Sequence, residues 1–165
     1  MHVPPLIQTT QRELMVDTSD VDLSSRAIYP FWSREKIRFG DVDRQNHVNN
    51  LVICTYIECS RVEMRDRCFP EFAENKSLMW LIAHFEVSFK AALRYPGEVD
   101  VGCCVTRLGT KSYVLGHAVF RDDTCIATAQ TTTVFCDSTT YKSMVIPDEL
   151  RRHFEDLKPL EAPSQ

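Results

Sequence analysis

The most restrictive feature of the sequence is a helix-length segment, residues 49–67, that contains neither glycine nor proline. Its first half, residues 51–57, has the sequence LVICTYI and is apolar almost all the way round a helix, whereas its second half is rich in charged side chains. A helix that is apolar on every side has to be surrounded by protein. We therefore expect the first half to be buried on all sides, with Ile53 and Ile57 in the core, and the charged end to emerge into water.

Four strand-like segments follow this helix and can surround it. Residues 78–93 and 98–108 alternate between apolar and polar side chains, which is the period of a strand. A second pair, residues 112–121 and 124–136, is separated by only two aspartates, which is the spacing of a two-residue hairpin. Because links of hairpin length favour antiparallel neighbours, we expect four consecutive antiparallel strands.

A short strand and a short helix complete the pattern. Residues 32–40 alternate before the long helix, and residues 147–157 begin with a proline and two acids, which are favoured in the first turn of a helix. Since one sheet has to cover one apolar helix, the predicted fold class is α+β. We expect a single hotdog fold, in which a curved antiparallel sheet wraps around a central buried helix.

The same pattern predicts the domain organisation. Residues 1–29 are polar and show no sustained period, so we expect an N-terminal extension that is flexible or laid across a surface. Residues 30–156 form the hotdog domain, and residues 157–165 form a C-terminal tail.

Composition and charge exclude several classes of protein. The chain of 165 residues is 44% hydrophobic, which suits one globular domain, and its net charge of -4 argues against nucleic acid as a partner. No apolar run is long enough to predict a membrane-spanning helix, so no membrane partner is expected. The N-terminus does not have the pattern of a signal peptide, and the seven cysteines lack CxxC spacing, so we expect reduced thiols in a cytosolic (cytoplasmic) protein.

The junction between the first strand and the long helix, FGDVDRQNHVNN at residues 39–50, crowds small polar groups together. A calcium loop would need glycine at its sixth position and glutamate at its twelfth, but these positions hold Asn46 and Val52. The five histidines are scattered and pair with no cysteine at zinc-ligand spacing. We therefore expect neither a metal nor a cofactor.

Two interpretations of this junction stay open on the residues alone. In the structural one, Asn46 adopts a left-handed turn conformation and Asn49 caps the helix. In the functional one, the free backbone N–H groups of a helix that begins near Asn50 polarise a carbonyl, and Asp43 stands beside it. Such an arrangement suits acyl transfer.

The junction and the start of the helix resemble a family signature. The stretch RFGDVDRQNHVNNLVICTYIECSR resembles hotdog-fold acyl-CoA thioesterases of the 4-hydroxybenzoyl-CoA thioesterase type, and TRLGTKSYVLGHAVF resembles the Lys-Ser-aromatic strand of that family. The resemblance covers residues 31–140. The positions that carry the signature are Asp41, Asp43, the run from Asn46 to Asn50, Tyr56, Glu58 and Arg61.

This resemblance implies hydrolysis of an acyl-CoA to a free carboxylic acid and coenzyme A, without a cofactor. It implies Asp43 as nucleophile or general base and the backbone N–H of Asn50 as the group that polarises the carbonyl. The second-choice carboxylate is Glu58. The residues expected to contact substrate are His47, Asn49, Arg107, Lys111 and Ser112. Of these, Arg107 and Lys111 are expected to contact the phosphates of coenzyme A.

Other interpretations accompany this one. Asp41 is expected to order the turn, and Glu58 is expected to form an ion pair with Arg61. The rival functions are a non-catalytic module that binds acyl-CoA and a hotdog dehydratase. A sheet wrapped around one helix leaves an exposed edge, so we expect a homodimer or homotetramer. The aromatic side chains that either line an acyl pocket or belong to the core are Tyr56, Phe72, Trp80 and Phe85.

Overall fold

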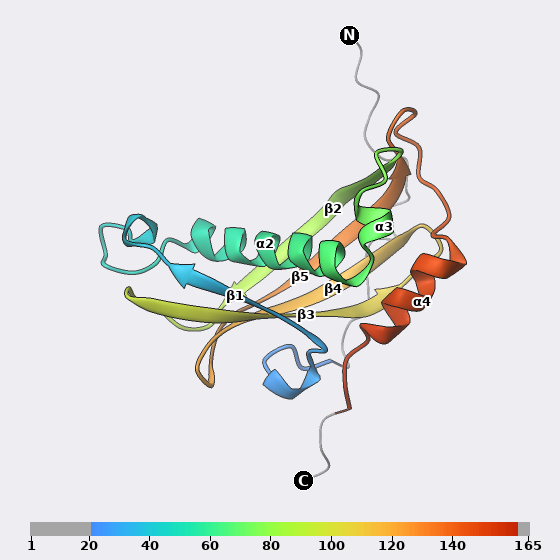
Figure 1. Ribbon diagram of the computed structural model, residues 1–165. Helices are drawn as coiled ribbons and strands as arrows, with labels where there is room; N and C mark the ends of the chain where they lie inside the picture. The colour runs from blue at the N-terminus through green and yellow to red at the C-terminus, as the bar shows by residue number, and fades with distance from the viewer. Residues whose placement is uncertain (1–20, 162–165) are drawn as a thin grey trace.

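The computed structural model describes residues 21–161 of the chain (Figure 1). Most of the predicted N-terminal extension and the end of the predicted tail therefore lie outside the described residues. The strands are β1 (Phe31–Ile37), β2 (Leu78–Phe89), β3 (Gly97–Leu108), β4 (Ser112–Arg121) and β5 (Thr124–Asp137). The helices are η1 (Arg26–Ile28), η2 (Phe39–Asp41), α2 (Asn50–Cys68), α3 (Pro70–Ala73) and α4 (Asp148–Asp156).

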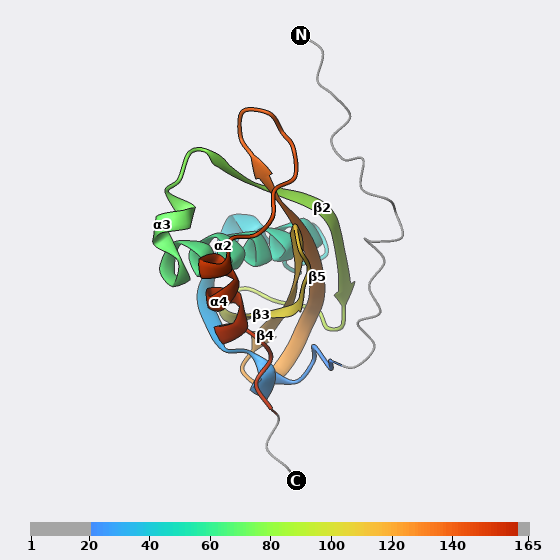
Figure 2. The same cartoon turned by 90° about the vertical axis from the view of Figure 1, so that its right-hand side faces the viewer.

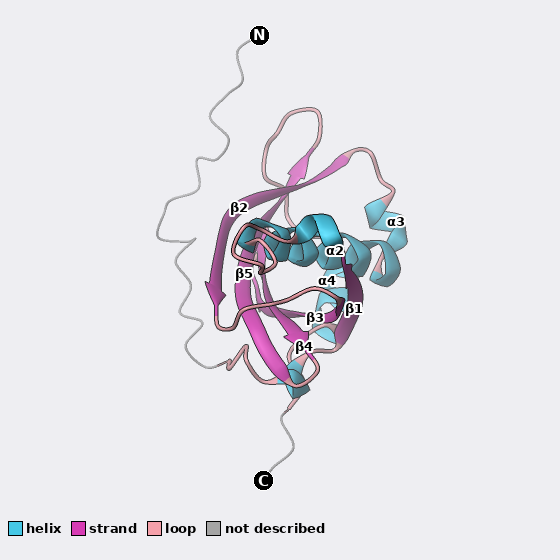
Figure 3. Ribbon diagram, turned by 90° about the vertical axis from the view of Figure 1, so that its left-hand side faces the viewer, coloured by secondary structure: helices cyan, strands magenta, loops and turns pink. Residues whose placement is uncertain are grey.

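The five strands form one antiparallel sheet in the order β1-β3-β4-β5-β2. Figure 3 shows the sheet curving around α2, with the edge strands β1 and β2 on opposite sides of the helix. The predicted fold class, a curved antiparallel sheet with a helix against its concave face, is confirmed. The predicted hairpin between residues 112–121 and 124–136 is also present, with Asp122 at a φ of 53° in the turn.

The prediction of four consecutive antiparallel neighbours is wrong for the first pair. β2 pairs with β5, and β3 pairs with β1, so the link between β2 and β3 joins the two halves of the sheet instead of closing a hairpin. This link crosses the end of the sheet beneath the start of α2. Leu93 in the link is buried, and its carbonyl accepts a hydrogen bond of 2.8 Å from the backbone N–H of Val48. The link is therefore packed into the core rather than folded into a tight turn.

Helix α2 packs on β1, β3 and β4, and only one of its faces is buried. The buried side chains of that face are Ile53, Tyr56, Ile57, Ser60 and Met64. The predicted burial of Ile53 and Ile57 is confirmed. The prediction that the first half is surrounded on every side is wrong, because Leu51 is 75% exposed and Thr55 is exposed on the opposite face. A single sheet covers a helix from one direction only.

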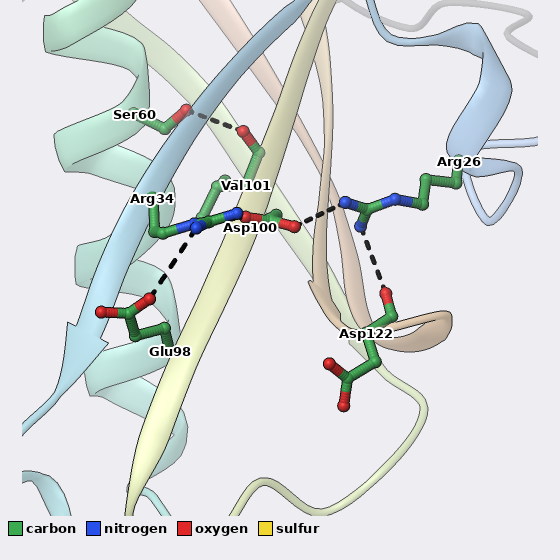
Figure 4. Close-up of polar contacts among 7 residues, drawn as sticks. All are labelled: Arg26, Arg34, Ser60, Glu98, Asp100, Val101 and Asp122. Atoms are coloured by element: carbon green, nitrogen blue, oxygen red, sulfur yellow. Dashed lines mark hydrogen bonds and ion pairs between the residues drawn. The ribbon is translucent and has the colours of Figure 1, made fainter.

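Residues 21–30 cover part of the outer face of the sheet, over β3 and β4 (Figures 2 and 4). The ring of Tyr29 lies over Gly102, where a Cβ atom would stand 2.5 Å from the ring, so only glycine leaves room for it. The guanidinium of Arg26 forms an ion pair of 2.5 Å with Asp100 and stacks on Trp32 at 4.5 Å. These contacts hold the segment against β3 and form a small second core on the outer face.

The end of the sheet far from the start of α2 is closed by α3 and α4. The predicted helix over residues 147–157 is confirmed as α4, and its buried Phe154 packs on Phe69 and Tyr113. Trp80 packs on Tyr113 and Phe135 in the same cluster, so this tryptophan belongs to the core. None of the helices within residues 21–161 is long and apolar enough to cross a membrane.

Candidate active site

The loop between β1 and α2, residues 38–49, forms a narrow ribbon that is closed by backbone hydrogen bonds. The N–H of Asn49 donates to the carbonyl of Asp41 at 2.9 Å, and the N–H of Asp43 donates to the carbonyl of His47 at 2.8 Å. Asn46 turns the chain with a φ of 61°, which confirms the predicted left-handed conformation. Four of the predicted site residues, Asp43, His47, Asn49 and Asn50, therefore lie on one short ribbon that leads into the helix.

Asp41 is a structural residue of this ribbon, as predicted. Its side chain is buried, and its Oδ2 accepts hydrogen bonds from the N–H of Arg38 at 2.7 Å and from the hydroxyl of Tyr56 at 2.6 Å. Burial, and then the hydrogen bond to Asp41, raises the pKa of Tyr56, so its hydroxyl keeps its proton and stays a donor. These two contacts of Oδ2 anchor the loop to Arg38, directly after β1, and to α2.

Asp43 has a different environment. Its side chain is exposed, and its Oδ1 accepts from the N–H of Gln45 at 2.8 Å and from the N–H of His47 at 3.3 Å. Its Oδ2 has no hydrogen-bond partner among the described residues. The carboxylate is thus held in place by hydrogen bonds to Oδ1, and Oδ2 remains available as an acceptor.

The start of α2 supplies a backbone donor. The side chain of Asn49 caps the helix by accepting from the N–H of Leu51 at 2.9 Å, and its carbonyl accepts from the N–H of Val52 at 2.9 Å. The predicted cap is confirmed. Next to these two bonded donors, the N–H of Asn50 has no acceptor within residues 21–161. It is therefore a free donor at the positive end of the helix dipole.

The predicted phosphate contacts lie elsewhere in the chain. β3 begins at Gly97, opposite Ile37 at the entry to the ribbon, and runs to Leu108 at the other end of the sheet. Because a strand rises by about 3.3 Å per residue, its two ends are roughly 36 Å apart. The hairpin after β3 carries the exposed Arg107 and Lys111 and the partly exposed Ser112. Within one chain, Arg107, Lys111 and Ser112 therefore lie far from Asp43.

The second-choice carboxylate, Glu58, is exposed on α2 and takes no part in the ribbon's hydrogen bonds. Its Oε1 lies 3.3 Å from Nη2 of Arg61, so the predicted ion pair is confirmed. All seven thiols are free, and Cys103, Cys104 and Cys136 are buried whereas Cys59 is exposed.

Sequence reasoning missed a polar pair in the core and an aromatic pair near the ribbon. His117 on β4 lies beside Thr131 on β5 inside the protein, and the only sequence signal was a histidine within an apolar strand. Phe39 packs edge-to-face on Tyr95 with ring centroids 5.9 Å apart, and both rings are exposed. No local sequence pattern predicts a contact between residues so far apart in the chain.

Solved structures with the same fold include several thioesterases. A protein of Pseudomonas aeruginosa strain PAO1 is 22% identical over 81% of this chain and 95% of its own, with a TM-score of 0.72. A thioesterase of Thermus thermophilus, solved in complex with coenzyme A and zinc, is 26% identical over 76% of this chain and 98% of its own, with a TM-score of 0.68. A DHNA-CoA thioesterase from Staphylococcus aureus is 16% identical over 76% of this chain and 86% of its own, with a TM-score of 0.67.

A search of curated proteins gave no match. The model of one protein family, described as the thioesterase-like superfamily, matches residues 37–154, a range that contains the ribbon, α2 and strands β2 to β5. The match covers well over half of the chain, and its start coincides with the last residue of β1. The chain therefore belongs to the thioesterase-like superfamily.

Proposed function

We propose that this protein is an acyl-CoA thioesterase that hydrolyses an acyl-CoA to a free carboxylic acid and coenzyme A. The observation that carries the proposal is the pairing of a carboxylate with a free oxygen, on Asp43, and a free backbone donor at a helix start, on Asn50. Family membership and the structural likeness to thioesterases support the same reaction.

The N–H of Asn50 is proposed to donate to the thioester oxygen, where negative charge develops in the transition state. In the direct route, Asp43 takes a proton from water, the resulting hydroxide adds to the carbonyl carbon, and the carbon–sulfur bond breaks. The departing thiolate then takes up a proton. In the covalent route, Oδ2 of Asp43 adds to the carbon and expels the thiolate, and water hydrolyses the acyl-aspartyl anhydride. Both routes require the same two residues.

The narrower assignment is to the 4-hydroxybenzoyl-CoA thioesterase type. It rests on the signature in the ribbon and on α2, namely Asp41, Asp43, Tyr56, Glu58 and Arg61. His47 and Asn49 belong to the same ribbon as Asp43 and are proposed to border the substrate. The Thermus thermophilus relative was solved with coenzyme A, which supports an acyl-CoA ligand for this chain.

A dimer would bring the phosphate contacts to the site. β2 is an edge strand whose inner face leaves the apolar side chains Ile82, Phe85 and Phe89 about two-fifths exposed. If two copies pair through β2 in antiparallel fashion, the far end of one sheet lies beside the near end of the other. Arg107 and Lys111 of one copy then approach Asp43 of the other, and the exposed apolar surfaces are covered.

The test is release of coenzyme A from a panel of aliphatic and aromatic acyl-CoAs, followed by titration of the free thiol. Turnover that disappears in Asp43→Asn, with its melting temperature preserved, supports the proposal. Tight binding of acyl-CoA without any release of thiol would favour the non-catalytic binding module instead. Addition or loss of water across the acyl chain, with the thioester intact, would favour a dehydratase.

A further inference from the structure

Tyr56, on the buried face of α2, forms a hydrogen bond that the proposed hydrolysis does not use. Its ring is 3% exposed and packs in the same core cluster as Ile37 and Val48. Its hydroxyl donates to Oδ2 of Asp41 at 2.6 Å, fifteen positions earlier in the chain. The proposed reaction needs a carboxylate and a backbone donor, so this contact between the helix and the ribbon takes no part in making or breaking bonds.

Asp41 is the junction of three segments. Its Oδ2 also accepts a hydrogen bond of 2.7 Å from the N–H of Arg38, directly after β1. Its carbonyl accepts a hydrogen bond of 2.9 Å from the N–H of Asn49, directly before α2. Together with the bond from Tyr56, these contacts tie the end of β1, the residue before the helix and the second turn of the helix to one another.

The bonds at this junction set the relative position of the two groups proposed to react. Asp43 follows Asp41 by two residues in the ribbon, and Asn50 follows Asn49 directly. The N–H of Asn49 is bonded to the carbonyl of Asp41, and the N–H of Leu51 is bonded to the side chain of Asn49. Because these neighbours are bonded, the N–H of Asn50 stays a free donor within residues 21–161, and its position relative to the ribbon depends on where Asp41 is held.

The ribbon has other anchors, which keep it folded without the hydroxyl of Tyr56. Val48 is buried, its N–H donates to the carbonyl of Leu93 at 2.8 Å, and it forms a β-bridge with Val42. These contacts close the base of the ribbon and join it to the link between β2 and β3. The bond from Tyr56 differs from them, because it comes from α2 and therefore fixes the ribbon relative to the helix that carries Asn50.

A small displacement of the ribbon is enough to slow the reaction. A carboxylate and an oxyanion donor act together only when both meet the same thioester carbonyl, and a misplacement of about 1 Å can reduce the rate by roughly 10²-fold. Without the hydroxyl of Tyr56, the carboxylate of Asp41 keeps the N–H of Arg38 as its hydrogen-bond donor within residues 21–161. The ribbon can then shift relative to α2 while the core around the aromatic ring stays packed.

We infer that Tyr56 is a positioning residue for the hydrolysis. Through Asp41, its hydroxyl holds the carboxylate of Asp43 at the position that the helix donor requires. The inference rests on the proposed function, because it takes Asp43 and the N–H of Asn50 as the groups that act on the thioester. Since Tyr56 does not touch the substrate, its hydroxyl contributes to kcat and leaves KM unchanged.

The first test compares two variants that each remove one buried hydroxyl from α2. Tyr56→Phe keeps the ring and is expected to lower kcat about tenfold, with KM for acyl-CoA within about twofold of the wild type. The control is Ser60→Ala, because Ser60 is buried on the same face but its hydroxyl lies 3.5 Å from the carbonyl of Val101 on β3 (Figure 4). This control is expected to leave kcat unchanged. Both variants are assayed well below their melting temperatures, so that each protein is folded.

The second test asks whether the hydroxyl acts through Asp41 and on Asp43. If it does, Tyr56→Phe should cost much less than about tenfold in kcat when Asp41→Ala or Asp43→Asn is already present, because the acceptor or the positioned carboxylate is gone. A role in stability alone predicts the same factor in every background.

The third test needs no turnover. The amide N–H of Asn49, which bonds to Asp41, is expected to exchange with solvent at least about tenfold faster in Tyr56→Phe, and at the wild-type rate in Ser60→Ala. Wild-type kcat in a folded Tyr56→Phe would overturn the inference, and so would an equal loss of kcat in Ser60→Ala or full additivity in both backgrounds. If Tyr56→Phe does not fold, Asp41→Asn, which weakens the same hydrogen bond, takes its place, and unchanged exchange at Asn49 has the same consequence. If no acyl-CoA is hydrolysed, the proposed function fails, and the exchange rate at Asn49 still decides whether Tyr56 holds the ribbon.

Discussion

Two aspartates that stand two positions apart in the sequence have different environments in the structure. Asp41 is buried and bonded to Arg38 and Tyr56, whereas Asp43 is exposed and keeps one carboxylate oxygen free. Asp41 lies where the ribbon is anchored to α2, and Asp43 lies next to the turn at Asn46. The same residue type therefore serves the fold at one position and is proposed to serve chemistry at the other.

The replacement Asp43→Asn preserves size and most of the loop hydrogen bonding but removes the basic oxygen. We expect kcat to fall by roughly 10²–10⁴, the usual weight of a positioned acid or base, with little change in melting temperature. The matched control is Asp41→Asn, which should cost roughly 1–3 kcal/mol of stability and less turnover, because a buried acceptor is lost. Steady-state hydrolysis and denaturant unfolding of both variants check this pair. Near-normal kcat in Asp43→Asn, together with loss of activity in Glu58→Gln, would move the assignment to Glu58.

His117 should make the stability of the protein depend on pH. Burial lowers its pKa to about 3, so the unfolded chain binds a proton near the ordinary pKa of 6.5 while the folded chain stays neutral. The stability contributed by the neutral imidazole is complete above pH 6.5 and is lost progressively as the pH falls toward 3. The slope approaches about 1.4 kcal/mol per pH unit within that window. Urea unfolding between about pH 7 and pH 5 should therefore be steeper in pH for the wild type than for His117→Phe, and parallel curves would contradict this prediction.

At the level of secondary structure, α2 joins the fold and the proposed site. Its buried face holds it to the sheet, and its first turn presents the N–H of Asn50. The cap made by Asn49 uses the neighbouring donors of that turn and leaves this one free. The start of the helix is thus both well anchored and incompletely bonded, a combination that suits stabilisation of a developing oxyanion.

Truncation of the buried face of α2 should destabilise the whole domain. Ile57→Ala is expected to cost roughly 2–5 kcal/mol, because it leaves a cavity between the helix and the sheet. The control on the same helix is Thr55→Ala, whose exposed side chain should change stability by no more than about 0.5 kcal/mol. The measurement is the urea midpoint at constant m-value. Similar midpoints for Ile57→Ala and the wild type would mean that the helix does not pack as described.

The free donor of α2 can be removed without altering a side chain that the reaction uses. Asn50→Pro deletes the N–H at the first helical position, where proline is otherwise well tolerated. We expect a loss of kcat of roughly 10²–10³, the weight of one oxyanion donor, while Asn50→Ala stays mild because the backbone group is retained. Circular dichroism shows whether the helix is preserved in both. Equal activities for a folded Asn50→Pro and Asn50→Ala would exclude the backbone donor.

At the level of the whole molecule, the proposed site is incomplete in one chain, because the hairpin with Arg107 and Lys111 lies at the opposite end of the sheet from Asp43. The long exposed edge of β2 and the exposed apolar side chains beside it provide the surface on which a second copy would pack. In such a dimer, each site combines the ribbon of one copy with the hairpin of the other.

Mixing two impaired variants, assayed at an acyl-CoA concentration well below the raised KM, tests this sharing of sites. One variant carries Asp43→Asn, and the other carries Arg107→Ala with Lys111→Ala, which should raise KM for acyl-CoA more than KM for a short thioester without the nucleotide. After unfolding and refolding together, half of the dimers are mixed, and each mixed dimer contains one intact site, so roughly a quarter of wild-type activity should return. The control is each variant refolded alone. If the mixture shows only the average activity of the two separate variants, the site is not shared between copies. Asp43, Arg107 and Lys111 then act within one chain, or the hairpin does not belong to the site.

The sequence by itself determined the features that depend on near neighbours. The period of the apolar residues predicted the strands, and the proline and two acids at residues 147–149 predicted α4. The spacing of two aspartates predicted the hairpin after β4, and the side chains of Asn46 and Asn49 predicted the turn and the cap. Each of these depends on backbone sterics and hydrogen bonds within a few residues, so the local sequence contains the necessary information.

The tertiary structure alone decided which distant segments meet. The periodicity of residues 78–89 is the same whether β2 pairs with β3 or with β5, and the structure pairs it with β5 while Leu93 of the link is buried. The apolar sequence of residues 51–57 does not show which face of the helix stays exposed when a single sheet packs against it. The contact between His117 and Thr131 depends on the register of β4 against β5, and a shift of one residue would turn His117 to the other face. Such choices are set by the free energy of packing the whole chain, which no short stretch of sequence contains.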